Sequence, residues 1–365
     1  MDTIDYKTDE RLRWLRFVMN PGLPMPEIKD WQGLFDFAVH QTIAGICSPM
    51  QYDNARLNKA VLLKWIRLTR LLRLKNSQLN RKAQKVVNTL KEAGFRCCML
   101  KGQGNAAMYP DPELRTPGDI DVWVDAGEDE TYAYVKSLYP QENASFKHIK
   151  FPMFEHTGVD VHHTPLKLYH PGHNRRLQRW IGAHKEEQMT HYVRLAGTDT
   201  DIAVPTAEFN AVYQMGHILI HLLDEGIGLR HMVDYYYLLR HLQSAPAAER
   251  VNIRDMWRSL GMLKLASAVM WVEHEVLGLP EEYLLTDPCE RVGRLLLEDM
   301  LEGGNFGHYS SRREYSKHGR YAKKWADARH SARFFRLFPG EVSFKMLGKA
   351  RTVCRIFMNN TKKLI

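Results

Sequence analysis

Cysteine is scarce in this chain of 365 residues, and the five cysteines are scattered along it. None shows the C-x-x-C spacing of zinc or thiol–disulfide sites, and an odd number cannot form a complete disulfide framework. No run of about 18 apolar residues occurs, so we do not expect a transmembrane helix. The first 17 residues carry too much charge for the apolar core of a signal peptide. We therefore expect a cytoplasmic protein in a reducing compartment.

Acidic residues are rare in two segments. From Arg312 to Ile365 there are 15 basic and 3 acidic side chains, and Arg56–Lys91 has 11 basic and no acidic ones. The formal net charge of +9 therefore reflects two basic segments on a mildly acidic body. The C-terminal segment has three open interpretations. It is a solvated helical surface, a membrane-surface or acidic-partner segment, or a nucleic-acid contact, whose binding would depend strongly on salt. The second interpretation rests on Phe334, Phe335, Leu337 and Phe338 among the arginines.

Hydrophobic periodicity predicts an α+β, predominantly helical fold with a small mixed β-sheet at its core. Apolar residues recur at helical spacing from about residue 9 to 53, over a long helix from about 54 to 93 with Gly94 as its C-cap, and again over 206–301, which includes a helix at 252–277. Short apolar runs predict strands at 95–100, 119–124, 148–154 and 158–163, with a helix at 129–139. We expect an N-terminal helical region (1–94), an α/β core (95–205), a C-terminal helical domain (206–305) and a basic tail (306–365).

Two acidic residues interrupt the apolar run at 119–124. Asp119 and Asp121 stand two positions apart, so in a strand both side chains point to one face, opposite Ile120. Two such carboxylates repel each other unless a cation lies between them, and their oxygens suit Mg²⁺ (or Mn²⁺) together with substrate phosphates. The alternative is a solvated strand face that carries two acids by chance. The neighbouring motifs favour the metal site.

These motifs supply groups for phosphate and for a third metal ligand. Lys101, Gly102, Gln103 and Gly104 form a turn before a short helix, where backbone N–H groups and the Lys101 charge can approach phosphate oxygens. Arg115 can pair with a phosphate through two hydrogen bonds. If the strand at 158–163 lies beside the one at 119–124, Asp160 completes a cluster of three carboxylates. Such a cluster can hold two metal ions that activate a hydroxyl and stabilise a pyrophosphate leaving group.

Together these residues resemble the uncharacterised bacterial nucleotidyltransferase family of the DNA polymerase beta-like nucleotidyltransferase superfamily. The resemblance covers about residues 25–305 and rests on Leu100–Lys101–Gly102, Tyr109–Pro110, Arg115, Asp119–Ile120–Asp121 and Val159–Asp160–Val161–His162. It implies that Asp119 and Asp121 are paired metal ligands and that Asp160 is the third carboxylate. The superfamily usually has a Gly–Ser pair where this chain has Lys101–Gly102, so Lys101 or the backbone of Gly102–Gly104 would contact the triphosphate instead.

The resulting hypothesis is a Mg²⁺-dependent nucleotidyltransferase that moves a nucleoside monophosphate from an NTP such as ATP to an unidentified hydroxyl or phosphate acceptor. The alternative is a non-catalytic scaffold of the same fold, which binds a nucleotide or a protein partner. A weaker third hypothesis is nucleotide addition to RNA ends.

His217 and His221 lie four positions apart, so on a helix they share one face. This spacing can bind Zn²⁺, but the intervening Glu of H-E-x-x-H is missing. We therefore favour the interpretation that both histidines pack against Arg230 and Asp234, where the helical domain meets the core.

Overall fold

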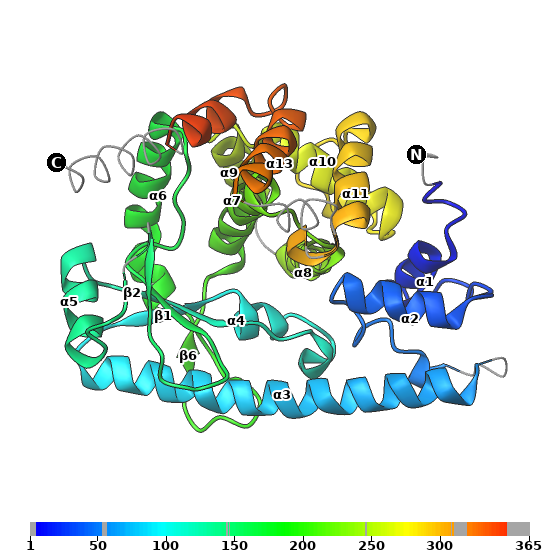
Figure 1. The fold of residues 1–365 in the computed structure, drawn as a ribbon, viewed down its shortest axis with the longest axis horizontal. Helices are drawn as coiled ribbons and strands as arrows, with labels where there is room; N and C mark the ends of the chain where they lie inside the picture. The colour runs from blue at the N-terminus through cyan, green and yellow to red at the C-terminus, as the bar shows by residue number, and fades with distance from the viewer. Residues whose placement is uncertain are drawn as a thin grey trace.

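One long helix extends along the whole molecule, beneath the other elements in Figure 1. The computed structural model describes residues 5–52, 57–143, 145, 147–244, 247–307, 309 and 320–348. The long helix α3 (Lys59–Glu92) begins at Asn58, whose side chain accepts a hydrogen bond from the Ala60 N–H. Near its start, Trp65 packs edge-on against Phe35 of α2 (Trp31–His40). Farther along, its apolar face covers the sheet.

The sheet is small and mixed, as the sequence predicts. Its strands are β1 (Cys97–Leu100), β2 (Ile120–Val124), β3 (His148–Lys150) and β4 (Val159–His162), in the order β1-β2-β4-β3. The β2 and β4 strands are parallel neighbours, while β1 and β3 pair antiparallel at the two edges. Strands β5 (Tyr192–Val193) and β6 (Ile202–Ala203) form a separate two-stranded ladder.

Side-chain alternation gives the four-stranded sheet two different faces. Ile120, Val122 and Val124 join the apolar cluster beneath the sheet, together with α3 and with Val135 of α5 (Glu128–Leu138). On the other face, Trp123 stacks on Phe209 of α7 (Ala207–Asp224). Asp121 lies on this second face, so the acidic side of β2 faces the helical body.

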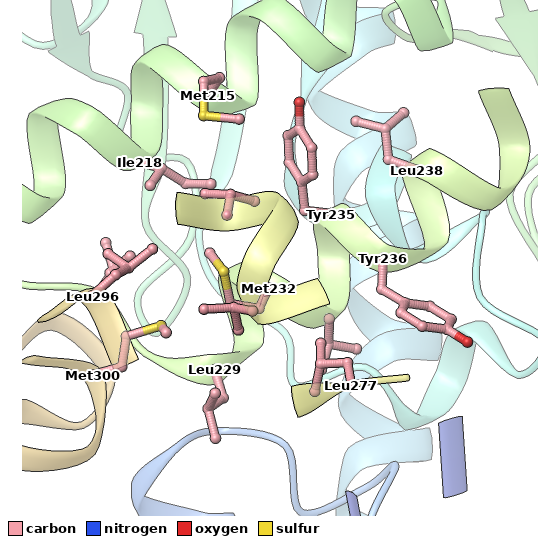
Figure 2. Close-up of a cluster of buried hydrophobic side chains, with 14 of the residues drawn as sticks. Met215, Ile218, Leu229, Met232, Tyr235, Tyr236, Leu238, Leu277, Leu296 and Met300 are labelled. Atoms are coloured by element: carbon pink, nitrogen blue, oxygen red, sulfur yellow. The ribbon is translucent and has the colours of Figure 1, made fainter. Parts of the chain in front are cut away.

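The helical body packs around one large apolar core. Figure 2 shows part of this core, where side chains of α7, α8 (Leu229–His241) and α11 (Glu290–Gly303) point toward one another. Met215, Met232 and Met300 are fully buried there. Further helices are α1 (Glu10–Met19), α4 (Gly102–Ala106), α6 (Pro171–Thr190), α9 (Ala247–Ser259), α10 (Leu263–Trp271) and α13 (Arg320–Arg333). Within the described residues, no helix has the length and apolar character needed to cross a membrane.

The C-terminal basic segment is partly integrated into this core. Phe334 and Phe338 are buried, whereas Phe335 is exposed and Leu337 half-buried. Residues 308, 310–319 and 349–365 of the predicted tail lie outside the described residues, as do 53–56 near the start of the predicted long helix. Because the core cluster extends from Tyr6 to Val342, it joins residues from both predicted helical regions and from the tail. The boundaries at 94, 205 and 305 stay predictions.

Three local differences separate the structure from the expected elements. The predicted helix at 252–277 is divided into α9 and α10 at Gly261, which has φ +72°. The strand expected at 148–154 ends at Lys150. Helix α6, for which the sequence analysis made no prediction, contributes only Leu177, Ile181, Gln188 and Met189 as buried residues, which makes its apolar pattern weak.

Candidate active site

The structure brings together the three predicted carboxylates. Asp121 and Asp160 are direct partners in the β2–β4 register, so their side chains leave the sheet on the same face. Asp119 precedes β2, and its carboxylate lies over Gly158, where an added Cβ would be 2.8 Å from Cγ. The backbone N–H of Ile120 donates to the Gly158 carbonyl over 2.9 Å, which holds the start of β2 beside the residue that precedes β4. The neighbouring strands that the sequence analysis required are therefore present.

The carboxylates open into a cavity of about 490 Å³ between the sheet and the helical body. The sheet side contributes Asp119, Asp121, Asp160, His148 and His162. Helix α7 contributes His217 and His221, and α8 contributes Arg230, His231 and Asp234. The cavity thus joins the α/β core to the helical body, and both supply polar side chains.

Asp121 is held in its charged form by two neighbours. Its Oδ1 lies 2.8 Å from His162 Nε2 and 3.4 Å from Lys101 Nζ. Burial would raise the pKa of Asp121, but the Lys101 charge and the His162 hydrogen bond together lower it below the ordinary range. Burial also lowers the pKa of His162 to about 4, so near neutral pH the ring is uncharged and its Nε2–H donates to Asp121.

Asp160 has the opposite character. Burial, followed by the charges of Asp121 and Asp119, raises its pKa to about 6. The like charges of the neighbouring carboxylates add to the effect of burial, and a bound cation would oppose both. His148 Nε2 lies 3.5 Å from Asp160 Oδ2.

One group of donors among the described residues fits a divalent metal ion, and of the three predicted carboxylates it includes Asp160 but not Asp119 or Asp121. Ligand atoms of His148, Asp160 and His162 all lie within 4.8 Å of one another. His148 and His162 are direct partners across β3 and β4, and each has a buried Nδ1 without a hydrogen-bond partner among the described residues. Carboxylate oxygens suit Mg²⁺ or Mn²⁺, and imidazole nitrogens suit transition metals.

The predicted phosphate-binding turn is only partly directed at the cavity. Lys101 and Gly102 line it, and both have positive φ, at 52° and 42°. Such a conformation is uncommon for a lysine and is a form of backbone strain found at functional sites. Gln103 is buried and donates a hydrogen bond to Asn80 of α3 instead. Gly104 packs against Val204, away from the carboxylates. The turn therefore contributes its first two residues to the cavity.

Arg115 lines the cavity but is engaged by an acid. Its Nε and Nη2 donate to the two oxygens of Asp234 over 2.7 and 2.8 Å, and both side chains are buried. Tyr109 also donates its hydroxyl hydrogen to Asp234. A phosphate contact by Arg115 stays a prediction, because Asp234 occupies the Nε and Nη2 donors of its guanidinium.

Several cavity residues had no functional role in the sequence analysis. His217 and His221 were assigned to packing, and their rings do lie 4.1 Å apart, but both also line the cavity. Burial lowers the pKa of both histidines, so near neutral pH they are uncharged. Lys147 and His231 also line the cavity, although no motif marks them. Their positions follow from tertiary packing, so only the i, i+4 histidine spacing was available as a signal.

Comparison with protein families agrees with this arrangement of strands and acids. The model of a family described as uncharacterised nucleotidyltransferase matches residues 27–278. The chain belongs to this nucleotidyltransferase family. The match includes the sheet, all three carboxylates, and the cavity-lining parts of α7 and α8.

Other comparisons add little to the family assignment. Among solved structures, one similar chain is the crystal structure of an antigenic nucleotidyltransferase-like protein from Paracoccidioides brasiliensis. It shares 12% sequence identity, and the match covers 52% of this chain and 92% of that chain. Its TM-score of 0.28 is too low to carry an argument about this protein. The comparison with curated proteins found no match.

Proposed function

We propose that this family member is a metal-dependent nucleotidyltransferase that moves a nucleoside monophosphate from an NTP to a hydroxyl or phosphate acceptor. The observation that carries the proposal is the pairing of Asp121 with Asp160 across two parallel strands, with Asp119 beside them, in one cavity. Asp119, Asp121 and Asp160 would hold Mg²⁺ or Mn²⁺, with Lys101 directed at the phosphates. A reducing, cytoplasmic setting is part of the proposal, because Cys47, Cys97 and Cys98 are free buried thiols.

In the proposed reaction, the acceptor oxygen forms a bond to the α-phosphorus of the NTP. The bond between that phosphorus and the bridging oxygen breaks, and pyrophosphate leaves with the electron pair. Asp160 either completes the metal site or, when the acceptor is a hydroxyl, accepts its proton, and in the metal-free protein its pKa is raised to about 6. Bound divalent metal would supply charge neutralisation on the phosphates. His162 keeps Asp121 oriented through the 2.8 Å contact.

Transfer of label from α-labelled NTPs to acceptors in a lysate, with Mg²⁺ or Mn²⁺, tests this proposal. We expect labelled product with the wild type and none with Asp119→Asn or Asp121→Asn. Asp160→Asn should reduce the rate by about 10²–10⁴-fold, the usual contribution of a general base. Asp129→Asn is the control, because Asp129 is exposed on the first turn of α5 and does not line the cavity.

A non-catalytic nucleotide-binding or protein-interaction scaffold is the second candidate. The contacts of Asp121 favour it, because Lys101 and His162 already neutralise and orient that carboxylate without a metal. Isothermal titration separates the two candidates. Metal-dependent NTP binding that Asp119→Asn and Asp121→Asn abolish supports the enzyme, whereas undiminished binding in the double variant would overturn the assigned metal roles.

A further inference from the structure

Two cationic side chains of the cavity, Arg230 and Lys147, form no ion pair within the part of the chain that the structure describes. Arg230 stands at the start of α8, and its Nη1 donates to the Thr116 carbonyl over 3.3 Å. Its guanidinium also lies 5.7 Å from the centre of the Phe306 ring. Lys147 directly precedes β3, the edge strand on the far side of β4. Acids that act on these cations electrostatically, without forming an ion pair within 4.0 Å in the described residues, include Asp234 for Arg230, and Asp121 and Asp160 for Lys147.

Burial makes these unpaired charges costly. Burial, followed by the neighbouring Arg115 charge, lowers the pKa of Arg230 to about 10. The Arg230 and Lys147 side chains are both half-buried, and a cation withdrawn from water without an ion-pair partner is unfavourable, a penalty that an anionic ligand relieves. Both cations therefore favour occupation of the cavity by an anion.

The cavity charges divide into paired and unpaired groups. Arg115 pairs with Asp234, and Lys101 pairs with Asp121. Asp119 and Asp160 remain on the sheet side, and Arg230 and Lys147 flank them from the α8 side and the β3 edge. A ligand that carries both divalent cations and phosphates would complement this separation of charge, since its metal ions meet the carboxylates and its phosphates meet the cations.

We propose that Arg230 and Lys147 form a phosphate clamp, which takes the role that sequence analysis gave to Arg115. The inference rests on the proposed function and deepens it, because it assigns the phosphate-binding groups of the same cavity. Arg230 suits bidentate contact with phosphate oxygens, and Lys147 supplies a point charge. The uncharged His217 and His221 rings beside them offer N–H donors. The ligand chemistry is a polyphosphate, either the triphosphate of the NTP or a phosphate group of the acceptor.

Titration of the full-length protein with inorganic tripolyphosphate in EDTA tests the clamp without metal. We expect the wild type to bind, with an affinity that falls as salt rises, because the contact is ionic. Arg230→Gln should weaken binding at least about tenfold, the loss that corresponds to one charge-assisted contact of about 1.4 kcal/mol or more. Arg230→Lys should retain part of the affinity. Arg240→Gln is the matched control, since Arg240 lies on the same helix outside the cavity.

Lys147→Gln provides a second test, since its loop position makes it independent of α8 folding. It should also weaken tripolyphosphate binding, with an unchanged melting temperature. The clamp is overturned if the wild type does not bind tripolyphosphate, or if folded Arg230→Gln and Lys147→Gln proteins both bind it as the wild type does.

The test of the phosphate clamp can fail or succeed independently of the test of nucleotidyl transfer. Asp119→Asn should bind metal-free tripolyphosphate as well as or better than the wild type, because it removes a repulsive charge, even though it should abolish transfer. Tripolyphosphate binding without any nucleotidyl transfer would therefore support the clamp and count against the enzyme. Competition between ATP and tripolyphosphate assigns the clamp to the NTP triphosphate, whereas simultaneous binding assigns it to a phosphorylated acceptor.

Discussion

Gly158 controls the position of the Asp119 carboxylate. An added Cβ would lie 2.8 Å from Asp119 Cγ and Oδ1, so Gly158→Ala must displace that side chain. Because Asp119 is exposed, it can turn away without disturbing the sheet. We expect a folded protein whose Mn²⁺ affinity, measured by isothermal titration, falls about tenfold, the lower range for loss of an orienting contact at a metal site.

Gly182→Ala is the matched control for this prediction. An added Cβ at Gly182 meets no atom within 4 Å, and Gly182 lies within α6. Alanine should leave Mn²⁺ affinity unchanged there and slightly stabilise the helix. Equal Mn²⁺ affinity in the Gly158→Ala and wild-type proteins would contradict the role of Asp119 as a metal ligand.

The raised pKa of Asp160 predicts that its ionised form, which the proposed function needs, destabilises the metal-free protein. Its pKa is raised from 3.8 to about 6 in the fold, so its neutral form stabilises the native state below about pH 4. This stabilisation is lost as the pH rises through 6. Asp160→Asn cannot ionise, and at pH 7.5 without metal it should be more stable than the wild type by about 1–3 kcal/mol, since one pKa unit corresponds to about 1.4 kcal/mol.

Urea unfolding of both metal-free proteins at pH 7.5 and pH 4.5 measures this difference. The difference in free energy of unfolding between Asp160→Asn and the wild type should be smaller at pH 4.5, because the wild-type carboxyl becomes protonated in the folded protein there. A constant gap at the two pH values would show that Asp160 does not titrate between them.

At the residue scale, the alternation of side chains along a strand predicts which acidic residues share a face. It does not predict which side chains they pair with. The spacing of Asp119 and Asp121, and of Asp160 and His162, is enough to place each pair on one face of a strand. The choice between Arg115 and Arg230 is different, because both are basic residues near cavity motifs. Asp234, which engages Arg115, lies 119 positions later in the chain. Only the tertiary fold shows which arginine is paired.

At the scale of elements, the Arg115–Asp234 pair joins α8 to the segment that leads into β2. Both side chains are at least nine-tenths buried, and Arg115 makes two hydrogen bonds to Asp234. Asp234→Ala leaves a buried guanidinium without its counter-ion, and such losses typically cost about 3–5 kcal/mol. We expect a reduction of this size in the free energy of unfolding, measured with urea.

Asp255→Ala is the control for the buried pair. Asp255 forms an ion pair with Arg258 on α9, but both side chains are more than half exposed. Its removal should change the free energy of unfolding by no more than about 0.5 kcal/mol. A loss below about 1 kcal/mol in Asp234→Ala would mean that Arg115 is not dependent on this carboxylate.

Element prediction succeeds where the pattern is strong and local. The long helix and the β2 strand have clear periodicity, and the structure confirms both with shifts of a few residues. The parallel pairing of β2 with β4 depends on contacts about 40 positions apart, which local periodicity cannot specify. The break between α9 and α10 has a local signal that periodicity does not include, because Gly261 with φ +72° ends α9, and the backbone N–H groups of Gly261 and Met262 donate to the Arg258 and Trp257 carbonyls.

At the scale of the whole molecule, the C-terminal segment is an integral part of the helical body in its described residues. Buried Glu341 accepts hydrogen bonds from the backbone N–H groups of Tyr169 and His170 over 2.8 and 3.0 Å. Buried Lys345 pairs with Asp224, at the end of α7, over 2.9 Å. The Glu341 contacts anchor the segment to the start of α6, and the Lys345 contact anchors it to α7, the helix that carries two cavity histidines.

Truncation of Phe338 and of Phe335 measures how much the C-terminal segment contributes to the core. Phe338 is 3% exposed and Phe335 is 45% exposed, although they are three residues apart in the same basic sequence. Phe338→Ala should lower the free energy of unfolding by about 3–5 kcal/mol, the usual cost of truncating a buried phenylalanine. Phe335→Ala should change it by no more than about 0.5 kcal/mol. If Phe338→Ala is as stable as the wild type, the segment does not contribute to the core.

If Phe335→Ala alone weakens binding to anionic vesicles, the membrane-surface interpretation applies to the exposed face, because the loss would then be independent of stability.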